Sequence, residues 1–89
     1  MKVVLNSCYG GFSLSEEVYN YLDLPWDGYG QDFENHRDDP KLVEAVEALG
    51  DKANGSHANL RIVEIPDDVE WFVDEYDGWE TAREKHRTW

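Results

Sequence analysis

The sequence predicts a small α+β domain in which two helices lie on one face of a mixed β-sheet of about four strands. Three observations predict it: a short β-branched segment at the start, two stretches of helical spacing in the first half, and strand-like segments joined by turn residues in the second half. The expected order is β-α-loop-α-β-β-β. With 89 residues, 40% of them hydrophobic, we expect a single domain over residues 1–89.

The first expected elements are a strand over residues 2–6 and a helix over residues 14–22. The strand segment, KVVLN, is short and β-branched, and turn residues follow it. Ser13 and Glu16 have the S-x-x-E spacing of a capping box. Apolar residues then recur at helical spacing, namely Leu14, Val18, Tyr21 and Leu22.

A loop and a second helix come next. Residues 23–38 mix Pro, Gly, Asp and Asn with aromatic residues, which is typical of an ordered loop anchored by its rings, Trp26, Tyr29 and Phe33. Asp39 suits an N-cap, Pro40 suits the first helical position, and Gly50 suits the end of a helix. The apolar stripe of this helix is Leu42, Val43, Val46 and Leu49.

The residue pattern in the last third of the chain predicts strands. Residues 59–65, NLRIVEI, form a second strand that Pro66 ends, and residues 69–76 alternate Val, Trp and Val against Glu, Phe and Asp. Asp77 and Gly78 indicate a tight hairpin turn, because both positions tolerate positive φ. The segment after this turn is therefore expected to return as a strand through the end of the chain, although its propensity would also allow a helix.

The charge of the chain narrows the classes of partner. Twenty acidic and eight basic residues give a formal charge of −12, which repels nucleic-acid backbones and anionic membranes. One cysteine cannot form an internal disulfide, no charged-then-apolar leader precedes the first strand, and no apolar run approaches the roughly 20 residues of a membrane span. We expect a soluble, intracellular protein, whose acidity either keeps it soluble at high concentration or lets its surface imitate nucleic acid.

The loop between the first strand and the first helix is a candidate ligand site. Backbone N–H groups and a helix dipole at such a turn can hold an anion, and adjacent glycines let a ligand approach the backbone. Against this, Glu16 and Glu17 would repel a phosphate, and no P-loop or dinucleotide fingerprint is present. The alternative is a structural turn with Tyr9 and Phe12 in the core. The candidate residues are Asn6, Ser7, Cys8, Tyr9, Gly10, Gly11 and Phe12.

The end of the chain is a second candidate site. Between Glu64 and Glu80 there are eight acids and no base, whereas Arg83, Lys85 and Arg87 lie within the last seven residues. On one strand these three would face the same side and form an anion-binding row, with His86 and Trp89 beside them. The alternative is that the row neutralises the acidic strand opposite, at about 0.2–1 kcal/mol for each cross-strand pair.

Other chemistry has less support. Cys8, near a helix start, could act as a nucleophile with His86 or His36 as its base, or could be a small buried residue. His36, His57 and His86 lack the spacing of metal ligands, so we expect neither a metal site nor a cofactor.

Both ends of the chain resemble a group of small bacteriophage proteins. The resemblance rests on KVVLNSCYGGFSLS at the start and on EYDGWE and EKHRTW at the end. It implies a phage accessory protein of the host cytoplasm, without indicating an activity. Because small acidic phage proteins are often counter-defence factors, the resemblance also implies that role by analogy.

Two function hypotheses follow, with a third behind them. The leading one is a non-enzymatic protein, with a homo-oligomer as one option, that captures a small anionic, nucleotide-like molecule with the 6–12 loop and with Arg83, His86, Arg87 and Trp89. The alternative is an inhibitor whose acidic surface imitates nucleic acid and binds a host defence protein. Its residues would be Asp67, Asp68, Glu70, Asp74 and Glu75. The third is a small enzyme acting on a phosphate ester.

Overall fold

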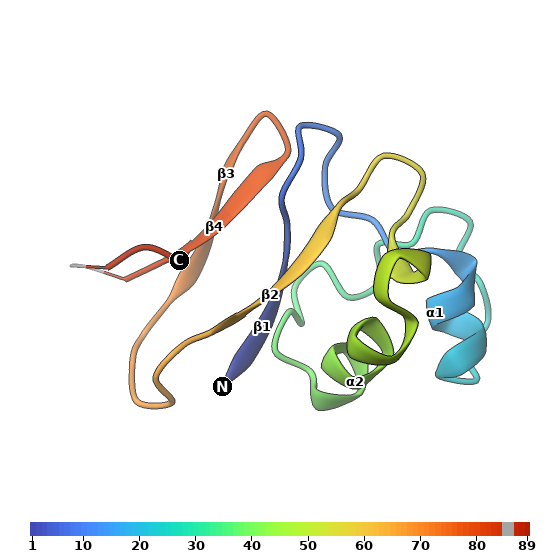
Figure 1. The fold of residues 1–89 in the computed structure, drawn as a ribbon, viewed down its shortest axis with the longest axis horizontal. Helices are drawn as coiled ribbons and strands as arrows, with labels where there is room; N and C mark the ends of the chain where they lie inside the picture. The colour runs from blue at the N-terminus through green and yellow to red at the C-terminus, as the bar shows by residue number, and fades with distance from the viewer. Residues whose placement is uncertain (85–86) are drawn as a thin grey trace.

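The computed structural model describes residues 1–84 and 87–89 and confirms an α+β domain. Its elements follow the predicted order (Figure 1). They are β1 (Lys2–Asn6), α1 (Glu16–Tyr21), α2 (Pro40–Leu49), the short 3-10 helix η1 (Gly50–Ala53), β2 (Leu60–Glu64), β3 (Phe72–Tyr76) and β4 (Trp79–Arg83).

The four strands form two antiparallel pairs, β1 with β2 and β3 with β4, where we expected one mixed sheet. β1 and β4 are neighbours, but they share no backbone ladder among the described residues. The Val4 N–H donates to the carbonyl of Arg37 (2.9 Å), and the Asn6 N–H donates to the carboxylate of Glu80 (2.8 Å). Because these donors are already used, β1 cannot pair with β4.

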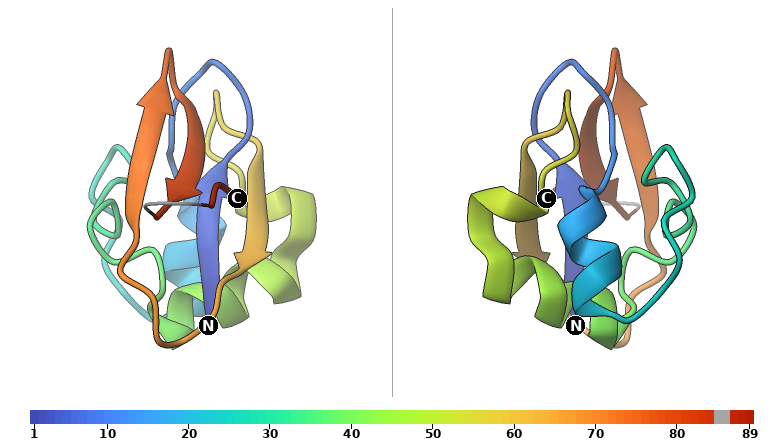
Figure 2. Two further views of the ribbon diagram at one scale, coloured as in Figure 1. Left: turned by 90° about the vertical axis from the view of Figure 1, so that its left-hand side faces the viewer. Right: turned by 90° about the vertical axis from the view of Figure 1, so that its right-hand side faces the viewer.

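The β1–β2 ribbon lies between the helices and the β3–β4 hairpin (Figures 1 and 2). Val4 packs with both helices in one apolar cluster, while Val3 and Leu5 pack on the other side with Ala82. Side chains alternate between the two faces of a strand, so a run such as VVL is buried on both sides. Both helices cover the same face of this ribbon, as predicted.

The predicted start is confirmed for α2 but not for α1. Asp39 caps α2 as predicted, accepting from the backbone N–H groups of Lys41 and Leu42. The predicted capping box of α1 is wrong, since the helix begins at Glu16 after Ser15. Residue 14 is instead held in extended backbone pairing, as a bridge between Leu14 and Asn54.

The loop over residues 23–38 is anchored by rings, as predicted. The Tyr19 ring packs edge-on against Trp26 (5.0 Å between centroids) and Phe33 (6.5 Å). Tyr29, the third ring predicted as an anchor, is exposed. Asp27 holds the turn between them by accepting N–H groups from three residues that follow it.

The β3–β4 hairpin has the predicted turn, with positive φ at Asp77 (50°) and Gly78 (92°). The strand predicted from there to the end of the chain stops at Arg83. The chain then turns back, and Trp89 exchanges two backbone hydrogen bonds with Ala82 (2.7 and 2.9 Å). The predicted single basic row is therefore wrong for Arg83 and Arg87, and Lys85 lies outside the described residues.

Candidate functional site

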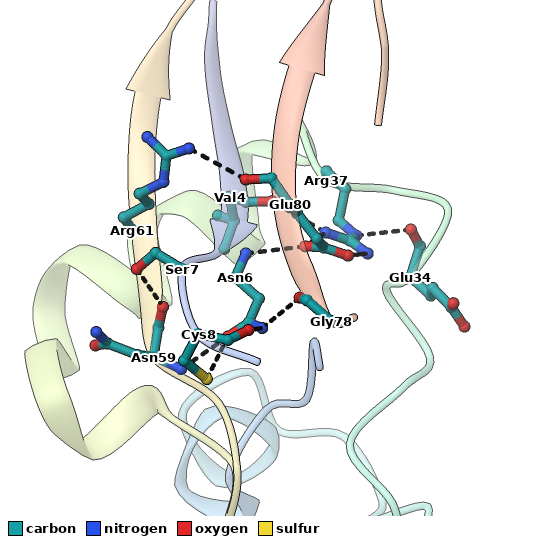
Figure 3. Close-up of polar contacts among 10 residues, drawn as sticks. All are labelled: Val4, Asn6, Ser7, Cys8, Glu34, Arg37, Asn59, Arg61, Gly78 and Glu80. Carbon is teal, nitrogen blue, oxygen red and sulfur yellow. Dashed lines mark hydrogen bonds and ion pairs between the residues drawn. The ribbon is translucent and has the colours of Figure 1, made fainter. Parts of the chain in front are cut away.

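A buried ion pair joins the hairpin to the rest of the protein (Figure 3). The Arg37 and Glu80 side chains are only 4% and 3% exposed, and two parallel hydrogen bonds of 2.6 and 2.8 Å connect them. The Arg37 Nε donates to the carbonyl of Glu34 (2.7 Å), and its guanidinium lies 3.7 Å from the centre of the Phe12 ring. This network of bonds offsets the cost of burying two charges.

Glu80 connects three segments that are distant in sequence. Its carboxylate accepts from Arg37, before α2, and from the N–H of Asn6, at the end of β1. Its backbone carbonyl accepts from Nη2 of Arg61 in β2 (3.1 Å), while the Arg61 Nε is buried without a partner in the described part of the chain. The sequence did not predict this junction, because no neighbouring residue distinguishes Glu80 from the other seven acids between Glu64 and Glu80 as the buried one.

Three residues of the predicted ligand loop serve the fold instead (Figure 3). The buried Asn6 amide donates to the carbonyls of Cys8 (2.8 Å) and Gly78 (2.7 Å) and accepts from the N–H of Asn59 (2.8 Å). Ser7 Oγ donates to the carbonyl of Asn59 (2.9 Å), and Cys8 Sγ donates to a carbonyl in the 56–58 loop (2.9 Å). These contacts fix the loop against β2 and the hairpin turn.

The glycines of the loop allow close packing of backbone against backbone. A Cβ at Gly10 would lie 1.8 Å from the carbonyl oxygen of His57, and one at Gly78 would lie 2.5 Å from the nitrogen of Gly11. Phe12 is buried, as the structural alternative predicted. Tyr9 is exposed, where that alternative placed it in the core, and its ring lies 5.5 Å from that of Trp79.

A cavity of about 280 Å³ opens beside the glycine loop. Gly10, Gly11 and Phe12 line part of its wall, and Tyr29 and His57 also line it. Three carboxylates also line it, those of Glu34, Glu75 and Glu80. Arg37 neutralises Glu80, but the Glu34 and Glu75 carboxylates have no ion-pair partner among the described residues, so this lining opposes the binding of a phosphate.

The described basic residues of the chain end lie away from this cavity. Arg83 is at the far end of β4 from the hairpin turn and pairs with Asp74 (2.8 Å). Arg87 lies over the Trp89 ring, and both line a separate hollow beside Met1. The structure thus does not bring the glycine loop together with Arg83, Arg87 and Trp89. His86 lies outside the described residues.

The five acids predicted to bind a partner follow one another along the β2–β3 connection and β3; we call them the acidic segment. Asp74 pairs with Arg83, and Asp67 pairs with the amino group of Met1. The others, Asp68, Glu70 and Glu75, are exposed and have no ion-pair partner within the described ranges.

Aromatic side chains gather on the outer face of the hairpin. Phe72 is 58% exposed, Tyr76 is 73% exposed and Trp79 is 40% exposed, and the strand register places Tyr76 directly opposite Trp79. Together with Asp74, Thr81 and Arg83 they form what we call the hairpin face. Aromatic residues are enriched at protein–protein interfaces, so the hairpin face is a candidate interaction surface. The sequence signal for it was the place of Phe72 among the polar residues of the alternating 69–76 segment.

The two large pKa shifts in the described residues belong to the 23–38 loop and its anchor. Burial raises the pKa of Tyr19 to about 12. Burial also acts to raise the pKa of Asp27, but N–H groups donated by Gly30, Tyr29 and Gln31 outweigh it and lower that pKa to about 2. Neither side chain lines the cavity, so anchoring of the loop accounts for both shifts.

The described residues contain no cluster of metal ligands and no membrane-spanning helix, and the chain matches no protein-family model. Over residues 1–84 and 87–89, no three His, Cys, Asp or Glu side chains gather as metal ligands would. No helix in the same residues is long and apolar enough to cross a membrane. The resemblance to bacteriophage proteins stays a prediction, because no protein-family model, curated protein or solved structure matches this chain.

Proposed function

We propose that this protein is a non-enzymatic phage accessory inhibitor that binds a basic, nucleic-acid-binding host protein. The binding surface consists of the hairpin face and the acidic segment. One observation carries the proposal: exposed aromatic rings and exposed carboxylates without ion-pair partners lie along the same short stretch of the described chain, from Asp68 to Trp79.

The two kinds of side chain have complementary roles in such a surface. Aromatic residues supply buried area and dominate binding energy at the centre of protein interfaces. Carboxylates around them steer a basic partner and reject acidic ones. A formal charge of −12 extends this preference over the whole molecule and suits a partner whose groove normally holds a phosphate backbone.

Capture of a nucleotide-like molecule, the leading hypothesis from the sequence, has less support. It required the glycine loop and the basic chain end to form one site, and the described residues of these segments line different hollows. The loop cavity is lined by the Glu34 and Glu75 carboxylates, which have no ion-pair partner among the described residues and disfavour an anion. Calorimetric titration with mononucleotides and cyclic dinucleotides tests this hypothesis directly, and we expect no binding.

The proposed function is tested with two variants of equal charge. The hairpin variant carries Asp68→Asn, Glu70→Gln and Glu75→Gln, and the control variant carries Glu16→Gln, Glu17→Gln and Asp32→Asn. All six side chains are exposed. Each variant loses three negative charges, so the overall charge is matched and only the position of the change differs.

Wild type and both variants are used as baits to capture the partner from the host in which the protein is produced. The partner is then purified and loaded with labelled DNA, and each of the three proteins is added to it. We expect wild type and the control variant to displace the DNA, and the hairpin variant to do so at least tenfold less effectively. Equal displacement by the hairpin variant, or a partner that binds no nucleic acid, would contradict the proposal.

A further inference from the structure

We infer that the free edge of β3 binds a basic, extended segment of the partner as a third strand of the hairpin. The inference rests on the proposed function and names its binding mode. It is carried by the direction in which the backbone groups of β3 point and by the charge along that edge.

The register of the hairpin shows which backbone groups face outward. Ala82 exchanges both its hydrogen bonds with Trp89, so its N–H and C=O point away from β3. In an antiparallel pair, opposite residues either bond to each other or both point away. Ala82 lies opposite Val73, and two residues along Glu80 lies opposite Glu75. The N–H and C=O groups of Val73 and Glu75 therefore point to the outer edge of β3.

These outward groups are available for pairing. No backbone or side-chain hydrogen bond from residues 1–84 or 87–89 reaches the main-chain N–H or C=O of Val73 or Glu75. The opposite edge of the hairpin is already occupied, because Trp89 pairs with Ala82 in β4. An uncovered edge strand is a template for another strand, and peptide recognition often uses such an edge.

Charge decides which strand fits. A second copy of this chain would bring Asp74 and Glu75 of one edge against the same residues of the other. Like charges facing each other across a strand pair are destabilising, and the net charge of −12 on each copy adds to the repulsion. An edge of this kind rejects its own copies and accepts a strand that carries lysine or arginine.

The residues of the hairpin face indicate which side chains the bound segment should carry beside its basic residues. Asp74 and Glu75 point to opposite faces of the strand, so adjacent basic residues of the bound segment would meet both, and the one beside Asp74 would compete with Arg83 for that carboxylate. On the outer face, Phe72 and Tyr76 flank Asp74 and are exposed. A segment with a basic pair at its centre and apolar or β-branched residues on either side would fit this arrangement.

A synthetic peptide with a central Lys-Arg pair flanked on each side by two Val-Thr pairs is the probe. It is titrated into wild-type protein by calorimetry, and amide exchange is followed by NMR. We expect binding that slows exchange of the Val73 and Glu75 amides at least tenfold. Absence of binding, or protection confined to other residues, would overturn the inference.

Two N-methylated peptides test the backbone pairing without changing the protein. In one peptide the odd-numbered central residues are N-methylated, and in the other the even-numbered ones. In a strand paired with β3, only one of these two sets directs its N–H groups toward β3. We expect one peptide to bind at least tenfold more weakly than the other. Equal affinities would show that no strand is added.

The matched protein variants are Glu75→Pro and Glu75→Gln. Both remove the charge, but only proline removes the outward N–H, and a sheet edge tolerates proline where the N–H faces solvent. With unchanged circular dichroism and thermal midpoint, Glu75→Pro should bind the peptide at least tenfold more weakly than Glu75→Gln. If Glu75→Pro fails to fold, the two N-methylated peptides decide the question alone.

The outcomes separate the inference from the proposed function. If the hairpin variant loses the host partner while both N-methylated peptides bind equally, the acidic surface is the binding site and strand addition is wrong. If the hairpin variant keeps the host partner, the proposed function fails as well.

Discussion

At the scale of single residues, Arg37 and Glu80 set the strongest constraint on this protein. Each is buried, and in the part of the chain that the structure describes each forms its only ion pair with the other. Removing one partner of a buried pair costs far more than the pair itself contributes, because it leaves a charge in a poorly solvated place. Glu80 also accepts the backbone N–H of Asn6, so the pair determines how the hairpin attaches to β1.

Glu80→Gln should lower the free energy of unfolding by about 3–5 kcal/mol, since it leaves the Arg37 guanidinium without its counter-charge. Urea denaturation followed by tryptophan fluorescence measures this. The matched control is Glu75→Gln, which lies opposite Glu80 in the register but is exposed, and which should change stability by less than about 0.5 kcal/mol. Similar losses in the two variants would contradict a structural role for the pair.

Gly10 is the second residue at which a small change should have a large effect. Gly10→Ala places a Cβ 1.8 Å from the carbonyl oxygen of His57, so the two loops must separate. We expect a loss of about 1–3 kcal/mol in unfolding free energy, as overpacking usually causes. Gly11→Ala meets no atom within 4 Å, so any loss it causes, about 1–3 kcal/mol, comes from the strain of its positive φ and not from packing. If Gly10→Ala keeps wild-type stability, the glycine does not serve packing.

At the scale of elements, the strands and the loops are held by different means. β1 bonds to β2 through one edge and to the Arg37 carbonyl and the Glu80 carboxylate through the other. The 23–38 loop has no ladder. Tyr19 and Asp27 hold its first part, and Arg37 holds its end through Val4 and Glu80. The hairpin is held by the turn, by its own ladder and by the ion pair, which leaves its outer edge and face open.

The Asp27 turn should make stability depend on acid pH. The pKa of Asp27 is about 2 in the folded protein and has an ordinary value of 3.8. A lowered pKa gives stability that is fully present above the ordinary value and is lost as pH falls toward the folded value. Between pH 5 and pH 2.5, wild type should therefore lose more unfolding free energy than Asp27→Asn, measured by urea denaturation at each pH. Equal losses would show that Asp27 does not hold this turn as a carboxylate.

At the scale of the whole molecule, charge opposes compactness. Twenty acidic residues share a small surface with eight basic ones, and four of the five ion pairs in the described part of the chain are exposed. Exposed pairs contribute little, whereas repulsion among many like charges adds up. The same excess of carboxylates that weakens the fold favours a basic partner.

Added salt should therefore stabilise the protein. Raising NaCl from about 20 mM to about 500 mM screens charges beyond a few ångströms, and repulsion is the larger effect here. We expect the thermal midpoint to rise, and to rise less in the hairpin and control variants, which each carry three fewer charges. A midpoint that falls with salt would show that attractive pairs dominate the surface.

The sequence by itself determined what depends on neighbours along the chain. The β-branched run of β1, the Asp39 cap with Pro40, and the Asp77-Gly78 turn each follow from the conformations that those residues prefer locally. These preferences act over a few residues, so the order of strands and helices could be predicted. So could the helices on one face.

Only the tertiary structure decided which distant residues meet. Arg37 and Glu80 are 43 positions apart, and their pairing splits the expected sheet into two and gives Asn6 a partner outside any ladder. The chain reverses after β4, so Arg83 and Arg87 do not form one row on a single strand. Backbone contact with His57 explains Gly10 better than a ligand does. Long-range electrostatics and close packing choose among arrangements that local preference leaves equal, which is why the acidic segment could be proposed from the sequence but the Arg37–Glu80 junction could not.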